Sequence, residues 1–177
     1  PHQYILCASP DLVEPLGKML GEKGAIHAAL PFEQPYHTPA FEPVLEEAEA
    51  FFRKMKLGHL DIPVYSCWTR KPFEKNIDKM LRLAVEQWAR PVHFLQTIEA
   101  MHEDGFRLFV EIGPRGNLSA FVDDILRDKP YAAIPIDRMY KPALTQFHQS
   151  IGLLAAHGVP LNPDYLYAGR ARPIEGE

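Results

Sequence analysis

The sequence has little cysteine, which argues against a fold built on disulfide bonds. Only Cys7 and Cys67 occur among its 177 residues, and they lie far apart in the chain. Small secreted domains that depend on disulfides carry a much higher proportion of cysteine. We therefore expect a protein of a reducing compartment and assign it to the cytoplasm.

Long apolar runs and a strong excess of one charge are also missing. No stretch approaches the roughly 20 apolar residues that a membrane-spanning helix needs. The 19 basic and 23 acidic residues give a formal net charge of −4, and the basic residues form no continuous run. Nucleic-acid-binding surfaces normally carry a clear basic excess. We therefore expect neither a membrane span nor a nucleic-acid partner.

The common motifs for metals and nucleophiles are lacking too. The eight histidines are not spaced as in zinc-binding helices, and no pair of cysteines brackets them. None of the four serines lies in a G-x-S-x-G turn, which exposes the nucleophilic hydroxyl of many hydrolases. We expect no metal and no resident cofactor, and the printed sequence offers no convincing nucleophile.

Apolar patterning predicts alternating strands and helices, punctuated by 17 dispersed prolines. The first part reads as a strand–helix–strand unit, and a boundary is expected near residues 33–40. Alternation of this kind favours a layered α/β fold. The expected strands are residues 4–8, 26–31, 62–66, 106–112 and 131–136. The expected helices are residues 11–23, 39–55, 76–88, 94–103, 118–126 and 142–157, followed by an irregular tail from residue 159.

His37 has a distinctive setting among the histidines. It directly follows Tyr36 and lies between Pro35 and Pro39, at a junction before a helix that Thr38 is expected to cap. Such junctions are rigid and direct side chains into clefts. The local pattern alone leaves two interpretations open, a functional histidine and an ordinary turn histidine.

Four sequence blocks form an ordered pattern around and after this histidine. They are residues 35–39 (PYHTP), 62–69 (IPVYSCWT), 87–94 (QWARPVHF) and 109–114 (FVEIGP). In this order and spacing they resemble the acyltransferase domains of type I polyketide and fatty-acid synthases, which are similar to malonyl-CoA:acyl carrier protein transacylases. The resemblance covers nearly the whole chain.

The resemblance implies a serine-hydrolase-like α/β core with an inserted ferredoxin-like small subdomain. Residues 1–33 would then be the C-terminal part of the small subdomain, and residues 34–137 the C-terminal part of the acyltransferase core. Residues 138–177 resemble the linker that follows the domain in multidomain polyketide synthases.

The resemblance also implies an activity and the residues that perform it. The family moves a malonyl or related acyl group from coenzyme A to a serine, and then to the phosphopantetheine thiol of an acyl carrier protein. Serine needs a base to take its proton as it attacks, and His37 matches that base. Gln87 matches the position whose backbone carbonyl orients the imidazole. Tyr36 matches the residue beside the acyl group, where relatives that use malonyl tend to have an aromatic ring and users of methylmalonyl often have serine.

Some features of the family are not in the printed sequence. Its Gly-His-Ser-x-Gly turn, its arginine for the malonyl carboxylate and its oxyanion loop all lie N-terminal to the region that resembles this chain. We therefore expect catalysis only as part of a larger domain, with the N-terminal half of the same acyltransferase domain as a partner. Arg70 also stands where the family usually has glycine, so we expect a different turn there.

The remaining expected partners are an acyl carrier protein and neighbouring synthase domains. The basic stretch Arg70–Arg82 is a candidate docking face for an acidic carrier, and it fits an ordinary solvated helix face as well. Two other functions stay open. One is a non-catalytic scaffold or docking fragment of a megasynthase, and the other is a free-standing ligand-binding protein in which His37 is structural.

Overall fold

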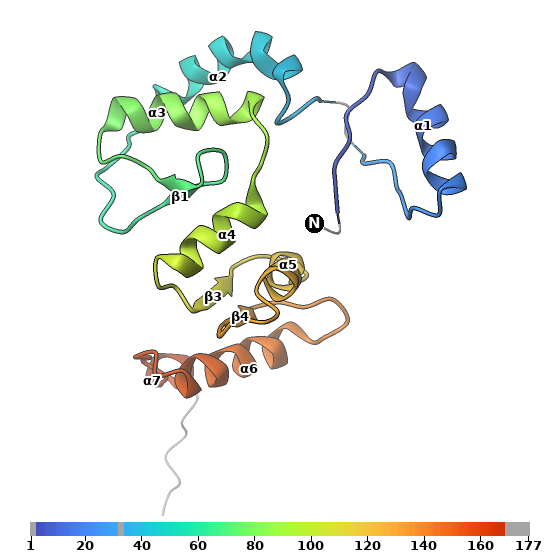
Figure 1. Ribbon diagram of the computed structural model, residues 1–177. Coiled ribbons are helices and arrows are strands. Elements are labelled where there is room, and N and C mark those ends of the chain that lie inside the picture. The colour runs from blue at the N-terminus through green and yellow to red at the C-terminus, as the bar shows by residue number, and fades with distance from the viewer. Residues whose placement is uncertain (1–2, 32–33, 169–177) are drawn as a thin grey trace, which may run out of the picture. The chain divides into compact units, whose positions relative to one another are not determined.

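The computed structural model describes residues 3–31 and 34–168. The chain divides into two compact units, Pro1–Ala100 and Met101–Glu177, and each is described by itself. Both contain helices and short strands, so the predicted α/β class is confirmed (Figure 1). No helix in the described ranges has the length and apolar character needed to cross a membrane.

The first unit begins with one helix between two extended segments. α1 spans Pro10–Glu22 and ends before Gly24, which has a φ of +76°. The strands predicted at residues 4–8 and 26–31 are wrong, because the structure has no strand in either segment. A strand needs a neighbour to take up its backbone hydrogen bonds, and no described segment pairs with these two. Their apolar side chains are exposed, Ile26 completely.

The segment after the candidate histidine is a 3₁₀ helix before it becomes an α-helix. η1 spans Pro39–Val44 and α2 spans Leu45–Phe52, where the sequence predicted a single helix. Pro43 accounts for the difference, because it has no N–H to donate and its ring clashes with the carbonyl four residues earlier in an α-helix. The predicted side-chain cap is wrong as well. The Thr38 hydroxyl donates instead to the carbonyl of Pro35 at 2.8 Å, which closes the preceding turn.

A tight hairpin follows. β1 (Tyr65–Ser66) pairs with β2 (Lys71–Pro72) in an antiparallel ladder, so only the end of the strand predicted at residues 62–66 is confirmed. Ser66 is buried, and its hydroxyl accepts hydrogen bonds from the backbone of the turn. Arg70 closes the turn with a φ of +61°. Arg70 thus has the left-handed backbone that glycine favours, and whether the turn differs from that of the family stays a prediction.

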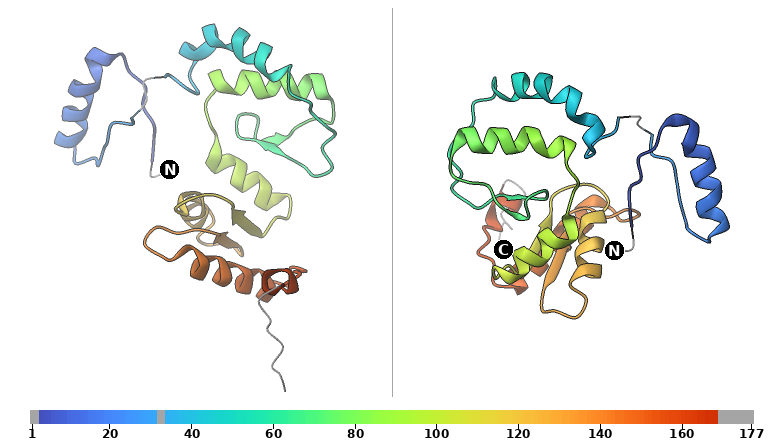
Figure 2. Two further views of the ribbon diagram at one scale, coloured as in Figure 1. Left: turned by 180° about the vertical axis from the view of Figure 1, so that it is seen from behind. Right: turned by 45° about the horizontal axis from the view of Figure 1, so that its top comes forward.

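Two helices and a short turn follow the hairpin. α3 spans Ile77–Glu86, and the Asn76 side chain caps it by accepting a hydrogen bond from the Lys79 N–H at 3.0 Å. The 3₁₀ turn η2 (Gln87–Ala89) continues α3, and α4 (Phe94–Glu103) has the bounds that the sequence predicted. α2 and α3 lie side by side (Figures 1 and 2). The buried apolar residues of this unit are Phe41, Leu81, Val85, Ala89 and Ile98.

Replacing Arg70 with glycine is expected to stabilise the first unit. The left-handed backbone costs a non-glycine residue about 1–2 kcal/mol, which the greater freedom of glycine in the unfolded chain partly offsets. We expect Arg70→Gly to raise the free energy of unfolding by about 0.5–1 kcal/mol, as measured by urea titration of tryptophan fluorescence. Arg82→Gly, in the middle of α3, is the matched control and should lower it by about 1 kcal/mol. A lower stability for Arg70→Gly would contradict the strained turn.

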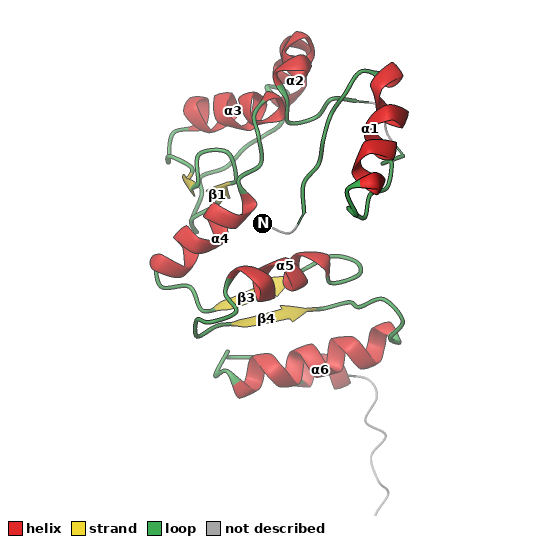
Figure 3. Cartoon of the chain, turned by 45° about the vertical axis from the view of Figure 1, so that its right-hand side comes forward, coloured by secondary structure: helices red, strands yellow, loops and turns green. Residues whose placement is uncertain are grey.

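The second unit is built on two parallel strands. β3 (Leu108–Glu111) pairs with β4 (Ala132–Pro135). Figure 3 shows α5 (Asn117–Ile125) on one side of this pair and α6 (Ala143–Ala156) on the other. Val122, Leu126 and Ile134 are buried among them. These four elements confirm the corresponding predictions, with ends that differ by at most two residues.

The last described part of the chain departs from the prediction. A short helix, α7 (Asp164–Tyr167), lies where an irregular tail was expected. Residues 169–177 of the expected linker lie outside the described residues. The division of the chain after residues 33 and 137 stays a prediction.

Glu111, at the end of β3, holds the first turn of α5. Its carboxylate accepts hydrogen bonds from the N–H groups of Leu118 at 3.1 Å and Ser119 at 2.7 Å, and from the Ser119 hydroxyl at 2.7 Å. Burial by itself raises the pKa of this carboxyl. The hydrogen bonds from Ser119, Leu118 and Asn117 together outweigh burial and lower the pKa below its usual value of 4.5. The folded unit therefore favours the ionised form.

We expect the start of α5 to loosen in acid. Because the pKa of Glu111 is lower in the folded state, its stabilising contribution is present above pH 4.5 and is lost as the pH falls through the lowered value. Protection of the Ser119 amide from hydrogen exchange should therefore be retained above pH 4.5 and fall as the pH is lowered further. Glu111→Gln should lose about 1 kcal/mol of protection near neutral pH, the usual size of a lost cap, and the pH dependence with it. The exposed Glu103→Gln is the control, and an unaltered pH dependence in Glu111→Gln would contradict the assignment.

Candidate active site

His37 is held by two consecutive backbone carbonyls. Its backbone N–H donates to the carbonyl of Trp88 at 2.7 Å, and its ring Nδ1 donates to the carbonyl of Gln87 at 2.9 Å. Because a carbonyl oxygen can only accept, the proton of the neutral ring lies on Nδ1 and the lone pair on Nε2. Within residues 3–31 and 34–168, Nε2 has no hydrogen-bond partner. The half-buried ring thus presents a nitrogen that can accept a proton.

The end of α3 explains why these carbonyls are available. A helix leaves its last carbonyl groups without partners inside the helix. α3 tightens into η2, Arg90 adopts an extended backbone, and Pro91 cannot continue the helix. The carbonyl of Gln87 accepts the Arg90 N–H at 3.2 Å as well as the imidazole. The end of α3 therefore places the carbonyls of Gln87 and Trp88 where His37 can donate to them.

The backbone of His37 is strained. Its φ of +62° lies in the left-handed region, which costs a residue with a side chain about 1–2 kcal/mol. Such conformations persist where the surroundings fix them, and they gather at functional sites. Here the bond to the Trp88 carbonyl fixes the backbone directly, and the turn closed by Thr38 lies beside it.

An aromatic cluster surrounds the histidine. The His37 and Trp88 rings are stacked, with centroids 5.9 Å apart and planes 8° from parallel. Tyr36 lies 5.1 Å from Phe41 and 5.8 Å from Trp88, measured between ring centroids. Phe41 is only 7% exposed and anchors the cluster, whereas Tyr36 is 37% exposed. The cluster thus joins the segment around His37 to the end of α3.

An ion pair links the same two segments at the surface. The Arg90 guanidinium donates to the Glu42 carboxylate at 2.7 Å and lies over the Trp68 ring at 5.7 Å. An exposed ion pair of this kind contributes at most about 1 kcal/mol. Its effect is to tie η1, the hairpin turn and the end of α3 together around the histidine.

The three residues predicted for the site meet in the structure. Tyr36 and His37 are adjacent, and Gln87 contacts His37 through its backbone carbonyl, which is the contact expected of it. The roles assigned to them stay predictions. The Gln87 side chain is half-buried and reaches back to the carbonyl of Ala84 at 3.4 Å. Sequence reasoning missed Trp88, although it lies next to Gln87 in one of the four blocks.

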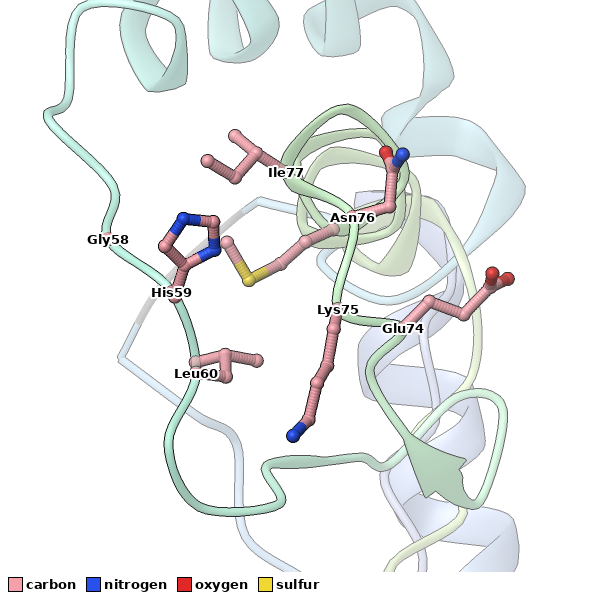
Figure 4. A pocket seen from close by; sticks show the side chains of 8 residues that line it. Gly58, His59, Leu60, Glu74, Lys75, Asn76 and Ile77 are labelled. Atoms are coloured by element: carbon pink, nitrogen blue, oxygen red, sulfur yellow. The ribbon is translucent and has the colours of Figure 1, made fainter.

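The remaining candidates in the described ranges are a metal site and a pocket away from His37. No three histidine, cysteine or acidic side chains of residues 3–31 and 34–168 gather closely enough to hold a metal ion. A small hollow beside His59 is drawn in Figure 4, where Lys75 and Glu74 point away from each other. The hollow is lined by Gly58, His59, Leu60, Glu74, Lys75, Asn76, Ile77 and Met80. None of these residues belongs to the aromatic cluster around His37.

The basic stretch divides between two elements. Arg70 and Lys71 lie in the hairpin, whereas Lys79 and Arg82 lie on α3. Lys79 forms an exposed ion pair with Glu74 at 2.7 Å. This pairing fits the interpretation as a solvated surface, and the docking role stays a prediction.

Comparison with known proteins relates the chain to acyltransferases. No family model matches it. It is 28% identical over 129 residues to the malonyl CoA-acyl carrier protein transacylase of Bacillus subtilis, a match that covers 72% of this chain and 40% of that protein. It is also 28% identical over 149 residues to the spectinabilin polyketide synthase system protein NorB of Streptomyces orinoci, covering 80% of this chain and 7% of that one.

The solved structures that match this chain are also acyltransferases and transacylases. The acyltransferase domain from the second module of the salinomycin polyketide synthase matches with a TM-score of 0.73 and 24% identity, over 94% of this chain and 40% of that one. The Clostridium perfringens malonyl CoA-acyl carrier protein transacylase matches with a TM-score of 0.67 and 26% identity, over 83% of this chain and 44% of that one. A malonyl-transacylase solved in complex with its type II polyketide acyl-carrier protein matches with a TM-score of 0.66 and 21% identity, over 81% of this chain and 44% of that one.

These relations define the class of protein. The homologues and structural neighbours of this chain are polyketide synthase acyltransferase domains and malonyl-CoA:acyl carrier protein transacylases, and the chain has part of the acyltransferase-domain fold. It spans less than half the length of the relatives described above.

Proposed function

We propose that this chain is part of an acyltransferase that moves a malonyl or related acyl group from coenzyme A to an acyl carrier protein. The observation that carries the proposal is the hydrogen bond between His37 Nδ1 and the Gln87 carbonyl. It leaves Nε2 as the basic nitrogen, and general-base catalysis requires such an oriented lone pair. The similarity to malonyl transacylases supplies the substrate class.

His37 acts as the base and then as the acid of each half-reaction. Nε2 takes the proton of a serine hydroxyl as the oxygen attacks the thioester carbonyl, and the imidazolium returns the proton to the coenzyme A thiol as the C–S bond breaks. In the second half Nε2 takes the proton of the carrier's phosphopantetheine thiol as the sulfur attacks the serine ester, and the imidazolium returns a proton to the serine oxygen as the C–O bond breaks. The Gln87 carbonyl stabilises the imidazolium less than a carboxylate would, but it fixes the same tautomer.

Tyr36 is assigned to the acyl-binding side of the site. It is the residue next to the base, its ring packs against Phe41 and Trp88, and part of it is exposed. A ring packed against two aromatic neighbours cannot easily move aside for a larger acyl group. This supports a preference for malonyl over α-branched malonyl groups.

The nucleophilic serine is assigned to the N-terminal half of the same acyltransferase domain. The chain spans 40% of the length of the Bacillus transacylase, so a complete domain of that kind needs further polypeptide. The exposed apolar side chains of the extended segments, Ile5 and Ile26 among them, fit a surface that such polypeptide covers. An acyl carrier protein and neighbouring synthase domains are the other proposed partners, and the proposed location is the cytoplasm.

The proposal is tested by trapping the covalent intermediate. The protein that contains this chain is incubated with radiolabelled malonyl-CoA, quenched in acid and separated under denaturing conditions. We expect protein-bound label that a carrier protein bearing phosphopantetheine then removes. A complete acyltransferase domain that never acquires label would refute the proposal and favour a non-catalytic scaffold.

A further inference from the structure

We infer that Trp88 is a positioning residue, which holds the imidazole of His37 in the plane from which Nε2 can take a proton. The inference rests on the proposed function. It is carried by a main-chain contact and a ring contact that the same residue makes to His37.

One contact is to the backbone of His37 and the other is to its ring. The Trp88 carbonyl accepts the backbone N–H of His37 at 2.7 Å and so holds a residue whose φ is +62°. The indole lies nearly parallel to the imidazole, with 8° between the planes. One residue therefore restrains both the backbone from which the side chain projects and the plane of its ring.

The hydrogen bond to Gln87 does not supply this restraint by itself. A bond at Nδ1 fixes one edge of the imidazole, but the ring can still tilt about that edge, which swings Nε2 on the opposite side. A flat neighbour limits the tilt because the ring can leave the parallel arrangement only by losing contact. The direction of the Nε2 lone pair follows, and proton transfer is sensitive to small errors in that direction.

Trp88 is itself well fixed. Phe41, which is buried, lies 6.2 Å from the indole between centroids, and Tyr36 lies 5.8 Å away. The indole N–H is buried and has no hydrogen-bond acceptor in the described part of the chain. A buried donor without a partner lowers stability relative to a phenyl ring of similar shape. The contribution of this side chain therefore lies in its flat ring and not in its N–H.

Two substitutions distinguish the effect of a flat ring at position 88 from the effect of an apolar side chain. Trp88→Leu keeps the main-chain carbonyl and an apolar side chain but removes the flat ring, whereas Trp88→Phe keeps a flat ring and removes the N–H. In the complete acyltransferase domain that contains this chain, we expect Trp88→Leu to lower kcat for malonyl transfer about tenfold, with the KM for malonyl-CoA within about twofold of its original value. Trp88→Phe should recover most of the lost kcat. Phe51→Leu, an exposed aromatic position on α2, controls for the loss of a ring elsewhere.

A spectroscopic measurement reports on the ring directly. The ring protons of His37 should be shifted upfield by the stacked indole in the NMR spectrum, and Trp88→Leu should abolish the shift. If Trp88→Leu removes the shift but leaves kcat unaltered, the inference is overturned. It is also overturned if a folded Trp88→Phe variant loses about tenfold in kcat relative to the unaltered domain, a result that does not depend on the leucine variant. The proposed function fails separately, when His37→Ala transfers malonyl as fast as the unaltered domain.

Discussion

Replacing His37 with alanine is expected to slow formation of the malonyl-enzyme by about 10⁴- to 10⁶-fold. Alanine has no ring nitrogen, so the variant lacks the group that is proposed to take the proton of the serine. The rate is measured by rapid mixing of the complete domain with radiolabelled malonyl-CoA followed by an acid quench. The KM for malonyl-CoA should change little, because the ring is assigned to proton transfer and not to binding.

Two controls make this result specific. His157→Ala removes an exposed histidine at the end of α6 and should leave the rate unaltered. Free imidazole added to the His37→Ala variant should restore part of the rate, since a small base can occupy the space that the side chain leaves. A His37→Ala variant that acylates at the original rate would show that the histidine is structural.

Replacing Tyr36 with serine is expected to change which acyl group the domain accepts. Methylmalonyl carries one more methyl group than malonyl at the α-carbon, and a pocket typically discriminates such a difference by about 1–3 kcal/mol, or about 10- to 200-fold. We expect the ratio of kcat/KM for malonyl-CoA over methylmalonyl-CoA to fall by about that factor in Tyr36→Ser. Tyr36→Phe should keep the ratio, because the effect comes from the ring. An unaltered ratio in Tyr36→Ser would place this side chain outside the acyl pocket.

Local patterns predicted the helices better than the strands. α4 has the predicted bounds because its apolar spacing and Gly105, with a φ of +99°, are signals that act within the segment. The strands predicted at residues 4–8 and 26–31 failed because strand formation depends on a neighbour that no local pattern reveals. The left-handed backbone of Arg70 could not be predicted either, because arginine has no local preference for that conformation.

In the candidate site, too, the sequence predicted some features and not others. The resemblance brought Tyr36, His37 and Gln87 together, since each lies in a recognisable block of sequence. The left-handed backbone of His37 and its stacking on Trp88 could not be read from the sequence. Both arise from contacts between segments about 50 residues apart, and such contacts follow from packing and not from local preference.

The most direct test of the account is to determine which ring nitrogen of His37 carries the proton in the neutral state. Long-range ¹H–¹⁵N NMR on protein labelled with ¹⁵N-histidine distinguishes the two tautomers. The hydrogen bond to the Gln87 carbonyl predicts a proton on Nδ1 and a bare lone pair on Nε2. A proton on Nε2 with a bare Nδ1 would contradict it, because the ring would then have no base to offer a serine.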